Sequence, residues 1–474
     1  MPAVPAQTAS AATLKESTLD ERGLHAVLAD AFARIVGKVQ QYIDISLELR
    51  RTHGERYGGM PPTELDARLQ PTGFRTTAID QQRQLYAAAH AALVDPLYSS
   101  RVMDDLVDWH DAFVQHFVTQ TTEGPIVSAA VEFAADGTLV AQVLESAAHR
   151  RFTYALEGSA VLVRALGAAA SRSLAKRAVY ERKSREIRDL VLATGEAFHR
   201  EFADPSVHGR YFLYERGRAP TSGPPEIEGL SHNNSQSYLI KGMEVLAALD
   251  ESDTWSGRLD RLLRFIRTQR DERSGLLHEF DFIVGHWDPG VVQRMSGDIN
   301  WQNQDGRETV ILGHTIAGLW EGPANRAARA CRKAEVAALL EEFIDTMNRL
   351  GGIHANGLPA NAFALVPEAD PPFRTLPWRE GAWQAELLWQ FLLRAVEVGI
   401  DLSAYDVRVG ATSLGLDRVL ARGLEYHDSR MFDGTFYVSE NGQELSRAGR
   451  QYAAPINHAA ETIDALGRVL VTRP

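Results

Sequence analysis

Residues 176–218, KRAVYERKSREIRDLVLATGEAFHREFADPSVHGRYFLYERGR, contain the unit that decides the fold. Apolar residues at three- and four-residue spacing predict an amphipathic helix over 176–202. Residues 204–218 hold two short apolar runs that meet near Gly209, as a tight hairpin turn requires. Such a unit cannot bury its apolar face alone, so we expect it to pack against further copies of the same arrangement.

The same arrangement returns along the chain from Arg101 to the C-terminus. Similar hairpin patterns occur at 131–142, 271–289 and 432–444. Helices predicted around them cover 176–202, 232–250, 255–270, 310–322, 326–350, 381–399 and 413–424. Helix pairs with a period of about sixty residues indicate units that stack or close into a ring. We therefore predict an all-α fold, an (α/α)6 toroid or barrel with short β-hairpin loops at one mouth, with an open solenoid as the alternative.

The N-terminal region precedes this repeat. Its apolar spacing from Leu24 to Val39 predicts a long amphipathic helix, and a second helix is expected over 78–93 after a loop rich in Gly and Pro. We predict an N-terminal helical extension over 1–95 and an (α/α)6 barrel catalytic domain over 96–474. We expect the extension to pack on the main body or on a partner subunit, where it offers a contact surface for a homodimer.

Composition narrows the classes of partner and location. The 474 residues carry a net charge of −12, which argues against nucleic acid or an anionic membrane as the main partner. No segment approaches the ~20 apolar residues of a spanning helix, and the N-terminus lacks a signal-peptide core, so we expect a cytoplasmic protein. The single cysteine, Cys331, excludes an intramolecular disulfide and is expected to be a small buried residue of a helix.

Polar and aromatic residues gather where predicted helices begin. They are found in five segments: His149–Tyr154, His278–Asp281 with Trp287 and Asp288, Leu312–Ile316 with Trp320, Pro377–Glu386, and Pro455–His458. Each segment alone has an ordinary structural explanation, since a histidine can cap a helix, a tryptophan can fill a core and Glu386 can complement a helix dipole. Motifs for nucleotide phosphates or for zinc are missing from the sequence, so we expect no cofactor and no metal.

The order of these segments resembles the N-acylglucosamine 2-epimerase family, which includes cellobiose 2-epimerases and aldose–ketose isomerases, over about residues 105–470. That family has Arg-x-x-aromatic, Gly-His-x-x-Glu, a Trp-rich segment ending in Gln-Ala-Glu, and Pro-Tyr-His. This chain has, in the same order, Arg151–Tyr154, Gly313–Ile316, Trp383–Glu386 and Pro455–His458.

The chain also departs from that family pattern at four places. Ala317 stands where the family has the glutamate of Gly-His-x-x-Glu, and Lys241 stands where it has a histidine. Gly381 and Ala382 replace an adjacent Trp pair, and one extra residue separates Pro455 from His458. A different substrate, a different reaction or lost activity therefore remain open.

The resemblance implies a sugar isomerase or 2-epimerase that needs no cofactor and works through an enediol. His314 and His458 would exchange the roles of general base and general acid on opposite faces of the sugar. Arg151 would stabilise the developing oxyanion, because a guanidinium stays protonated. Residues expected to bind the small carbohydrate substrate are Glu386, Lys241, Trp320, Trp378, Trp383 and His278.

Two other functions remain as alternatives. A glycoside hydrolase or lyase could use the same toroid, because a fold does not fix a function. It would need two carboxylates, for which Glu279, Asp281, Asp288 and Glu386 are candidates. A non-catalytic carbohydrate-binding relative is the other alternative, motivated by Ala317 and Lys241.

Overall fold

The computed structural model describes most of the chain. The described residues are 21–63, 65, 70–143, 148–212, 231–281, 308–354, 357–376, 379–430, 437–440, 443–444 and 453–472. Among these, the side chains of 21, 148–155, 231–235, 280–281, 379–384, 426–430, 437–440, 443–444 and 453–459 are outside the description.

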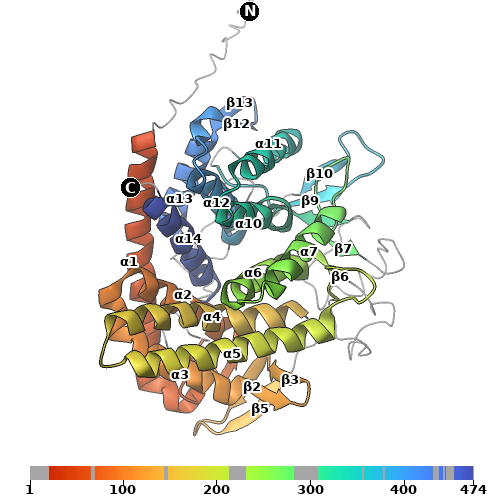
Figure 1. The fold of residues 1–474 in the computed structure, drawn as a ribbon. Coiled ribbons are helices and arrows are strands. Elements are labelled where there is room, and N and C mark those ends of the chain that lie inside the picture. Colours follow the sequence, from red (N-terminus) through yellow and green to blue (C-terminus); the bar gives the residue numbers. More distant parts are fainter. Residues whose placement is uncertain are drawn as a thin grey trace, which may run out of the picture.

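The long helices form two concentric layers around one axis (Figure 1). Each inner helix packs on the next one along the chain, and the last packs back on the first, which closes a ring. The inner layer consists of α2 (Ala78–Val94), α4 (Ala148–Arg172), α6 (Asn233–Leu249), the run α9 (Leu312–Thr315), η3 (Ile316–Glu321) and α10 (Gly322–Arg329), α12 (Ala382–Glu397) and α14 (Ala453–Thr472). The outer layer consists of α1 (Glu21–His53), α3 (Pro96–Phe117), α5 (Arg177–Phe202), α7 (Thr254–Thr268), α11 (Lys333–Leu350) and α13 (Leu416–Arg430). The predicted (α/α)6 toroid is confirmed.

The N-terminal helices are part of this ring. Helix α1 packs on α13 and α14, and α2 lies between α4 and α14 in the inner layer. Of the two placements expected for residues 1–95, the described helices therefore show the one on the main body. Because α2 closes the inner layer, the boundary expected at residue 95 does not separate an extension from the barrel, and the sequence-based division is corrected here.

Local sequence explains how the first inner helix begins and how closely it packs. The Thr77 side chain accepts a hydrogen bond from the Asp80 amide and so caps the N-terminus of α2. Asp95 caps α3 in the same way, accepting from the amides of Leu97 and Tyr98. Five alanines of α2, at 87, 88, 89, 91 and 92, are completely or almost completely buried, and such small side chains allow close contact with α4 and α14.

Short antiparallel sheets join the helices. The two-stranded sheets are β2 (Val118–Thr121) with β3 (Gly124–Val127), β6 (Ser231–His232) with β7 (Phe280–Asp281), and β12 (Asp406–Val409) with β13 (Thr412–Gly415). In the three-stranded sheets the central strand is β4 (Ala130–Phe133), between β1 (Arg75–Thr77) and β5 (Leu139–Val143); β9 (Ala362–Leu365), between β8 (Thr309–Ile311) and β10 (Phe373–Leu376); or β14 (Tyr437–Glu440), between β11 (Arg379–Gly381) and β15 (Gln443–Glu444). Strands β1, β6, β8 and β11 each end where an inner helix begins. They therefore mark one end of the ring, which we call the N-terminal mouth; the other end is the C-terminal mouth.

The four hairpins predicted from the sequence have different outcomes. The hairpin at 131–142 is confirmed as β4 and β5. At 432–444, the described strands β14 and β15 pair as predicted. At 204–218, the described part holds one bridge, between Ala203 and Tyr211, and residues 213–218 lie outside the description. At 271–289, strand β7 pairs with β6 from before α6 instead of with a neighbouring strand, and residues 282–289 lie outside the description.

Cys331 is not the buried helical residue that the sequence predicts. Helix α10 ends at Arg329 and α11 begins at Lys333, so the helix predicted over 326–350 is divided. Cys331 is exposed between them and has a left-handed φ of 54°. A residue in this region cannot continue the hydrogen bonds of a right-handed helix, which explains the break.

Candidate active site

A buried histidine–carboxylate pair lies where the fourth inner helix begins. His314 belongs to α9, directly after β8, and is 2 % exposed. Its Nδ1 lies 2.9 and 3.0 Å from the two carboxylate oxygens of Glu279, which is 1 % exposed. The Ile311 amide donates to the same carboxylate at 2.8 Å. Because Nδ1–H donates to Glu279, the imidazole lone pair is placed on Nε2, the atom that could accept a proton.

A second carboxylate holds this pair in place. Glu308 accepts from the Glu279 amide at 2.7 Å and lies 2.8 Å from His278 Nδ1. The hydrogen bond to Glu308 raises the pKa of His278 above its usual value. In addition, the Leu277 amide donates to the Thr315 hydroxyl at 3.1 Å, which ties the loop to the start of the helix. The loop that carries Glu279 is thus fixed from two directions.

Lys241 lies at the centre of a network that crosses the ring. Its ammonium group bonds to Glu461 of α14 and lies 3.4 Å from the Gln390 side-chain oxygen of α12. The Gln390 amide in turn donates to Glu461 at 2.9 Å. Burial opposes the charge of Lys241, but Glu461, Glu321 and Glu386 together raise its pKa above the usual value. Lys241 is therefore a permanent cation on the axis at neutral pH.

Glu386 and Ser237 connect this network to the N-terminal mouth. Glu386, in the second turn of α12, is fully buried and accepts from the Thr462 hydroxyl at 3.0 Å. Ser237 lies one helical turn before Lys241 on α6, and its hydroxyl is 3.5 Å from the His314 carbonyl oxygen. His314 and Glu386 thus lie near the starts of their inner helices, whereas Lys241 lies in the middle of α6.

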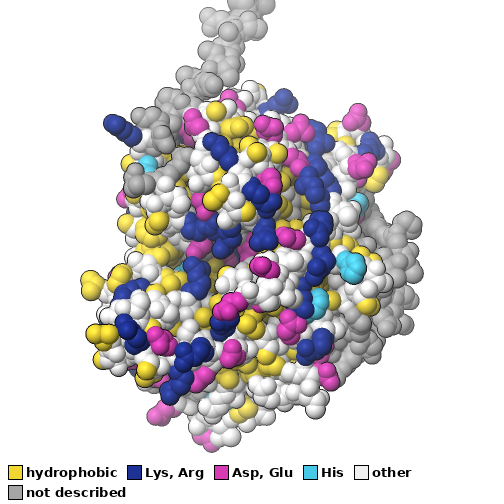
Figure 2. Space-filling model, in the orientation of Figure 1, with side chains coloured by type: hydrophobic (Ala, Val, Ile, Leu, Met, Phe, Trp, Pro, Cys, Tyr) yellow, Lys and Arg dark blue, Asp and Glu magenta, His cyan; other side chains and the backbone are white. Residues whose placement is uncertain are grey.

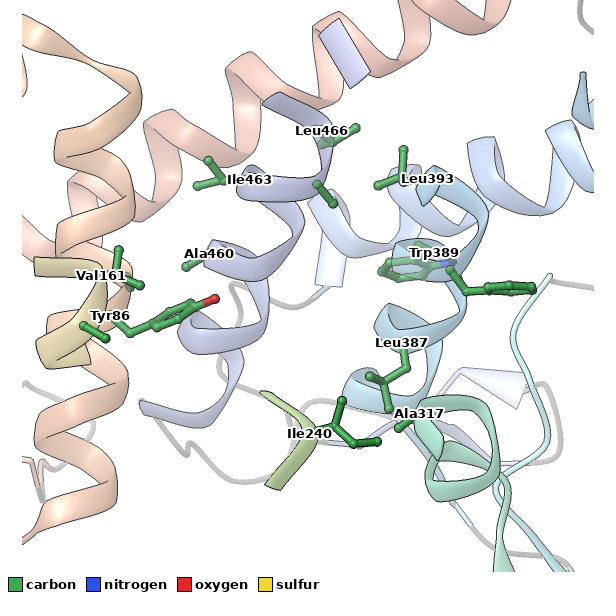
Figure 3. Close-up of a cluster of buried hydrophobic side chains, with 14 of the residues drawn as sticks. Tyr86, Val161, Ile240, Ala317, Leu387, Trp389, Leu393, Ala460, Ile463 and Leu466 are labelled. Atoms are coloured by element: carbon green, nitrogen blue, oxygen red, sulfur yellow. The ribbon is translucent and has the colours of Figure 1, made fainter. Parts of the chain in front are cut away.

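Two positions singled out from the sequence are core positions in the structure. Trp320, expected to stack on a sugar, is fully buried and packs edge-on against Phe343 of α11 at 5.2 Å between ring centroids. It therefore faces the outer layer, and its expected role at the substrate is corrected. Ala317 lies close to Ile240 and Leu387 in an apolar cluster (Figure 3), so this position carries no polar group to replace the family's glutamate.

Several predicted site residues cannot be placed by their side chains. Arg151 and His458 lie in the first two turns of α4 and α14, near the N-terminal mouth, but their side chains are outside the description. The same holds for the side chain of Trp383, and Trp378 is outside the description altogether. His278 is half-buried on the loop that carries Glu279.

Two features of this site were missed from the sequence. One is the pairing of His314 with Glu279 and the support from Glu308, since residues about thirty apart give no sign that they touch. The doublet His278–Glu279 is a partial signal, but the sequence pattern indicates substrate binding for His278 and only a hydrolase role for Glu279. The other is the π-helical segment Ile316–Glu321, which follows His314 directly. Single π-helical turns inside α-helices occur frequently at functional sites.

Comparison with known proteins places the fold. No family model and no curated protein matches the sequence. Among solved structures, the cellobiose 2-epimerase of Spirochaeta thermophila DSM 6192 aligns with a TM-score of 0.57 over 95% of this chain and 98% of that one. The chain has the fold of the sugar epimerases. The cellobiose 2-epimerase of Bacillus thermoamylovorans B4167 (TM-score 0.53, 90% and 98% covered) and a D-mannose isomerase (0.52, 91% and 98%) align similarly.

These alignments establish the architecture, but they do not identify the reaction, which has to be inferred from the residues of the site. The sequence identities are 13%, 14% and 13%, respectively, so the family resemblance seen in the motifs is confirmed at the level of the fold. Among the described residues, no group of His, Cys, Asp and Glu side chains is arranged to hold a metal ion. None of the described helices is long and apolar enough to cross a membrane.

Proposed function

We propose that this protein is a sugar 2-epimerase or aldose–ketose isomerase in which His314 moves the proton at C2. The observation that carries the proposal is the buried His314–Glu279 pair, with 2.9 and 3.0 Å contacts, at the mouth of an epimerase-type toroid. Such a pair has the two parts that general base catalysis needs, an acceptor nitrogen and a carboxylate that fixes its tautomer.

The chemistry requires one proton to leave and one to return. His314 Nε2 takes the C2 proton, the C–H electrons form a C1–C2 double bond, and the carbonyl oxygen becomes an enediol oxygen. Return of a proton to C2 on the opposite face, with loss of the proton on the C1 oxygen, gives the epimer. Return of a proton to C1, with loss of the proton on the C2 oxygen, gives the ketose. The Glu279 carboxylate stabilises the imidazolium formed in between. His458 is the proposed second acid and base, and Arg151 the proposed donor to the oxygen that gains charge.

Lys241 and Glu386 are proposed to bind sugar hydroxyls further along the axis of the ring than the His314–Glu279 pair. The permanent charge of Lys241 favours electron-rich oxygen atoms, and the Glu386 carboxylate accepts hydrogen bonds from hydroxyl groups. Both side chains are held by partners from α14, so their positions would be fixed before a sugar binds. Fixed polar groups of this kind support a specific orientation of the substrate.

The hydrolase alternative is less well supported by the geometry of Glu279. This carboxylate accepts hydrogen bonds from His314 and from the Ile311 amide, so its oxygens are engaged by donors within the protein. A hydrolase needs one carboxyl group that stays protonated as the general acid. Among the other candidates, Asp288 and the Asp281 side chain lie outside the description. Release of reducing sugar from an oligosaccharide, with no change at C2, would favour hydrolysis.

Deuterium exchange tests the proposal directly. Mannose, glucose and cellobiose are incubated in heavy water, and proton NMR follows loss of the C2–H signal together with formation of the epimer or ketose. We expect exchange with at least one of them, and His314→Gln should reduce the rate by roughly 1,000-fold or more. His208→Asn, at an exposed histidine on a turn, is the matched control and should exchange at the wild-type rate.

Two results would contradict the proposal. Normal exchange by His314→Gln would show that another group moves the proton. Tight binding of a sugar without exchange in the wild-type protein would support the non-catalytic alternative.

A further inference from the structure

A polar cavity lies on the axis of the ring, and His314 is not among the residues that line it. Its volume is about 70 Å³, and all six inner helices contribute to its walls. His90, Leu249 and Arg329 line it, and each lies in the last turns of its helix, so the cavity faces the C-terminal mouth. Lys241 and Gln390 lie one turn beyond Ser237 and Glu386 and form the side of the cavity toward the candidate active site.

Three carboxyl groups in this cavity have no hydrogen-bond donor among the described residues. Glu157 of α4 and Glu321 of η3 are 4 % and 3 % exposed, and neither accepts a hydrogen bond from any residue that the structure describes. Glu244 of α6 also lines the cavity, and its Oε1 is buried without a partner among the described residues. Buried carboxyl oxygens are nearly always hydrogen-bonded in folded proteins, so this wall lacks donors.

Two basic groups that line the cavity hydrogen-bond to carboxylates other than Glu157, Glu244 and Glu321. Lys241 bonds to Glu461, and Arg394 bonds to Glu397 at 3.1 Å. Burial disfavours ionisation of Asp464, but His90, Arg394, Arg164 and Arg468 lower its pKa to about 2.

Further out, the cavity reaches the surface of the molecule. Arg164 lies 3.7 Å from Asp464 and is half exposed, and Arg329 is exposed at the mouth. The Tyr86 hydroxyl points from α2 toward α14 (Figure 3). On the face drawn in Figure 2, basic and acidic side chains lie next to one another near the centre of the molecule. Basic and acidic side chains therefore balance each other at the rim of the cavity, whereas the carboxyl groups of the buried wall have no donor among the described residues.

The carboxyl wall retains protons because burial outweighs the nearby charges of Lys241 and Arg394. Burial and the charge of Glu461 raise the pKa of Glu157 to about 8. Burial and the charge of Glu244 raise the pKa of Glu321 to about 7. A ligand that brings positive charge and N–H donors would let both groups ionise and would satisfy their oxygens. The described acidic and histidine side chains form no metal site, which leaves an organic cation as the matching chemistry.

We propose that this axial cavity binds a small organic amine through Glu157, Glu244 and Glu321. An ammonium group offers up to three donors, which equals the number of carboxyl groups without one. The volume of about 70 Å³ admits roughly five water-sized groups, enough for a short aliphatic amine. The site adjoins the proposed sugar site at Lys241, but its amine-binding carboxyl groups take no part in the proposed reaction.

Titration calorimetry with a matched pair of ligands tests the site. The probes are 1,4-diaminobutane and 1,4-butanediol, which have the same length and differ in charge. We expect binding of the diamine with a stoichiometry of one and no binding of the diol. Binding should release protons, detected as a heat that varies with the ionisation enthalpy of the buffer. Affinity should rise by roughly tenfold from pH 6 to pH 8, because the carboxylates that hold the ammonium ionise over that range.

Substitutions of the cavity glutamates test whether the diamine binds in the cavity. Glu157→Gln and Glu321→Gln keep the side-chain size, replace a protonated carboxyl group by a neutral amide and so should fold; each should weaken diamine binding by roughly tenfold or more. Glu341→Gln, at an exposed carboxylate of α11, should bind as the wild type does. Thermal melting checks the fold of each variant. Absence of diamine binding, equal binding of the diol, or unchanged binding by both cavity variants would each overturn the proposal.

The test is also independent of the proposed function. His314→Gln should bind the diamine with wild-type affinity. Loss of deuterium exchange in that variant, or its absence in the wild type, bears on the sugar reaction alone, because the calorimetric measurement involves no turnover.

Discussion

At the scale of single residues, the candidate site depends on the charge and hydrogen bonding of the His314–Glu279 pair. Glu279 contacts the imidazole of His314 with both oxygens and receives the Ile311 amide as well. Three contacts of this kind fix a carboxylate in one orientation and hold the imidazole in one tautomer. The catalytic competence of His314 should therefore depend on the negative charge of Glu279 and not merely on the presence of a polar side chain there.

Glu279→Gln separates these two possibilities. The amide can still form hydrogen bonds, but it cannot stabilise an imidazolium and can hold His314 in the wrong tautomer. We expect kcat for C2 exchange to fall by roughly 100-fold or more while KM changes little, because the substituted group does not touch the sugar. Steady-state kinetics with the best substrate of the exchange panel measure both constants. A parallel rise in KM with unchanged kcat would show that Glu279 serves substrate binding instead.

A second residue-scale prediction concerns stability and pH. The pKa of Glu157 is raised to about 8 in the folded protein by burial and by Glu461, whereas in the unfolded chain it returns to an ordinary value near ~4.3. Its protonated form is therefore favoured by folding, and this stability is present at low pH and is lost as pH rises toward 8. The glutamine of Glu157→Gln does not titrate. The free energy of unfolding of this variant, relative to that of the wild type, should therefore rise by on the order of 3 kcal/mol between pH 5 and pH 8.

Urea unfolding in amine-free buffers at the two pH values measures this difference. Glu341→Gln, at an exposed position, should show no such growth. An equal difference at both pH values would mean that Glu157 titrates normally in the folded state.

At the scale of elements, the inner helices approach each other so closely that one glycine becomes necessary. A Cβ added at Gly158 of α4 would lie 2.5 Å from the Gln82 carbonyl oxygen and 3.0 Å from the Tyr86 nitrogen, both backbone atoms of α2. Gly158→Ala should therefore destabilise the protein by about 1–3 kcal/mol, although alanine is the better helix former. Gly167 on the same helix has no atom near its would-be Cβ, so Gly167→Ala should stabilise by up to about 1 kcal/mol. Thermal unfolding of the two variants gives opposite shifts if α2 and α4 touch as described.

The helices could be predicted well from the sequence because their apolar spacing is a local property. The helix predicted over 176–202 is α5, Arg177–Phe202, and that predicted over 232–250 is α6, Asn233–Leu249. The break at Cys331 was not predictable, since no Gly or Pro lies near it. The π-helical turn at 316–321 contains Gly318 and precedes Gly322 and Pro323, but these residues do not by themselves distinguish a π-helical turn from an α-helical one. In the site, the position of His314 followed from a short motif. Its partner Glu279 did not, because that contact forms only when the ring closes.

At the scale of the whole molecule, the ring unites segments from the two ends of the chain. Helices α1 and α2 pack on α14, so the last helix is covered by the first two. Helix α1 contributes a stripe of buried residues at three- and four-residue spacing, among them Leu28, Ile35 and Val39. A ring without α1 would leave apolar faces of α13 and α14 in water, so we expect residues 21–472 to unfold as one unit.

Ile35→Ala tests this unity with a probe that the N-terminal helices do not contain. Ile35 is fully buried, and its truncation should cost about 2–5 kcal/mol. All eight tryptophans follow residue 95, beginning at Trp109, so tryptophan fluorescence reports only on the rest of the ring. The fluorescence-detected midpoint in urea should therefore fall in Ile35→Ala, and it should be unchanged or slightly raised in Gly37→Ala, an exposed position of the same helix. If residues 1–95 unfolded separately, circular dichroism would show an early transition in Ile35→Ala while the fluorescence midpoint stayed at its wild-type value.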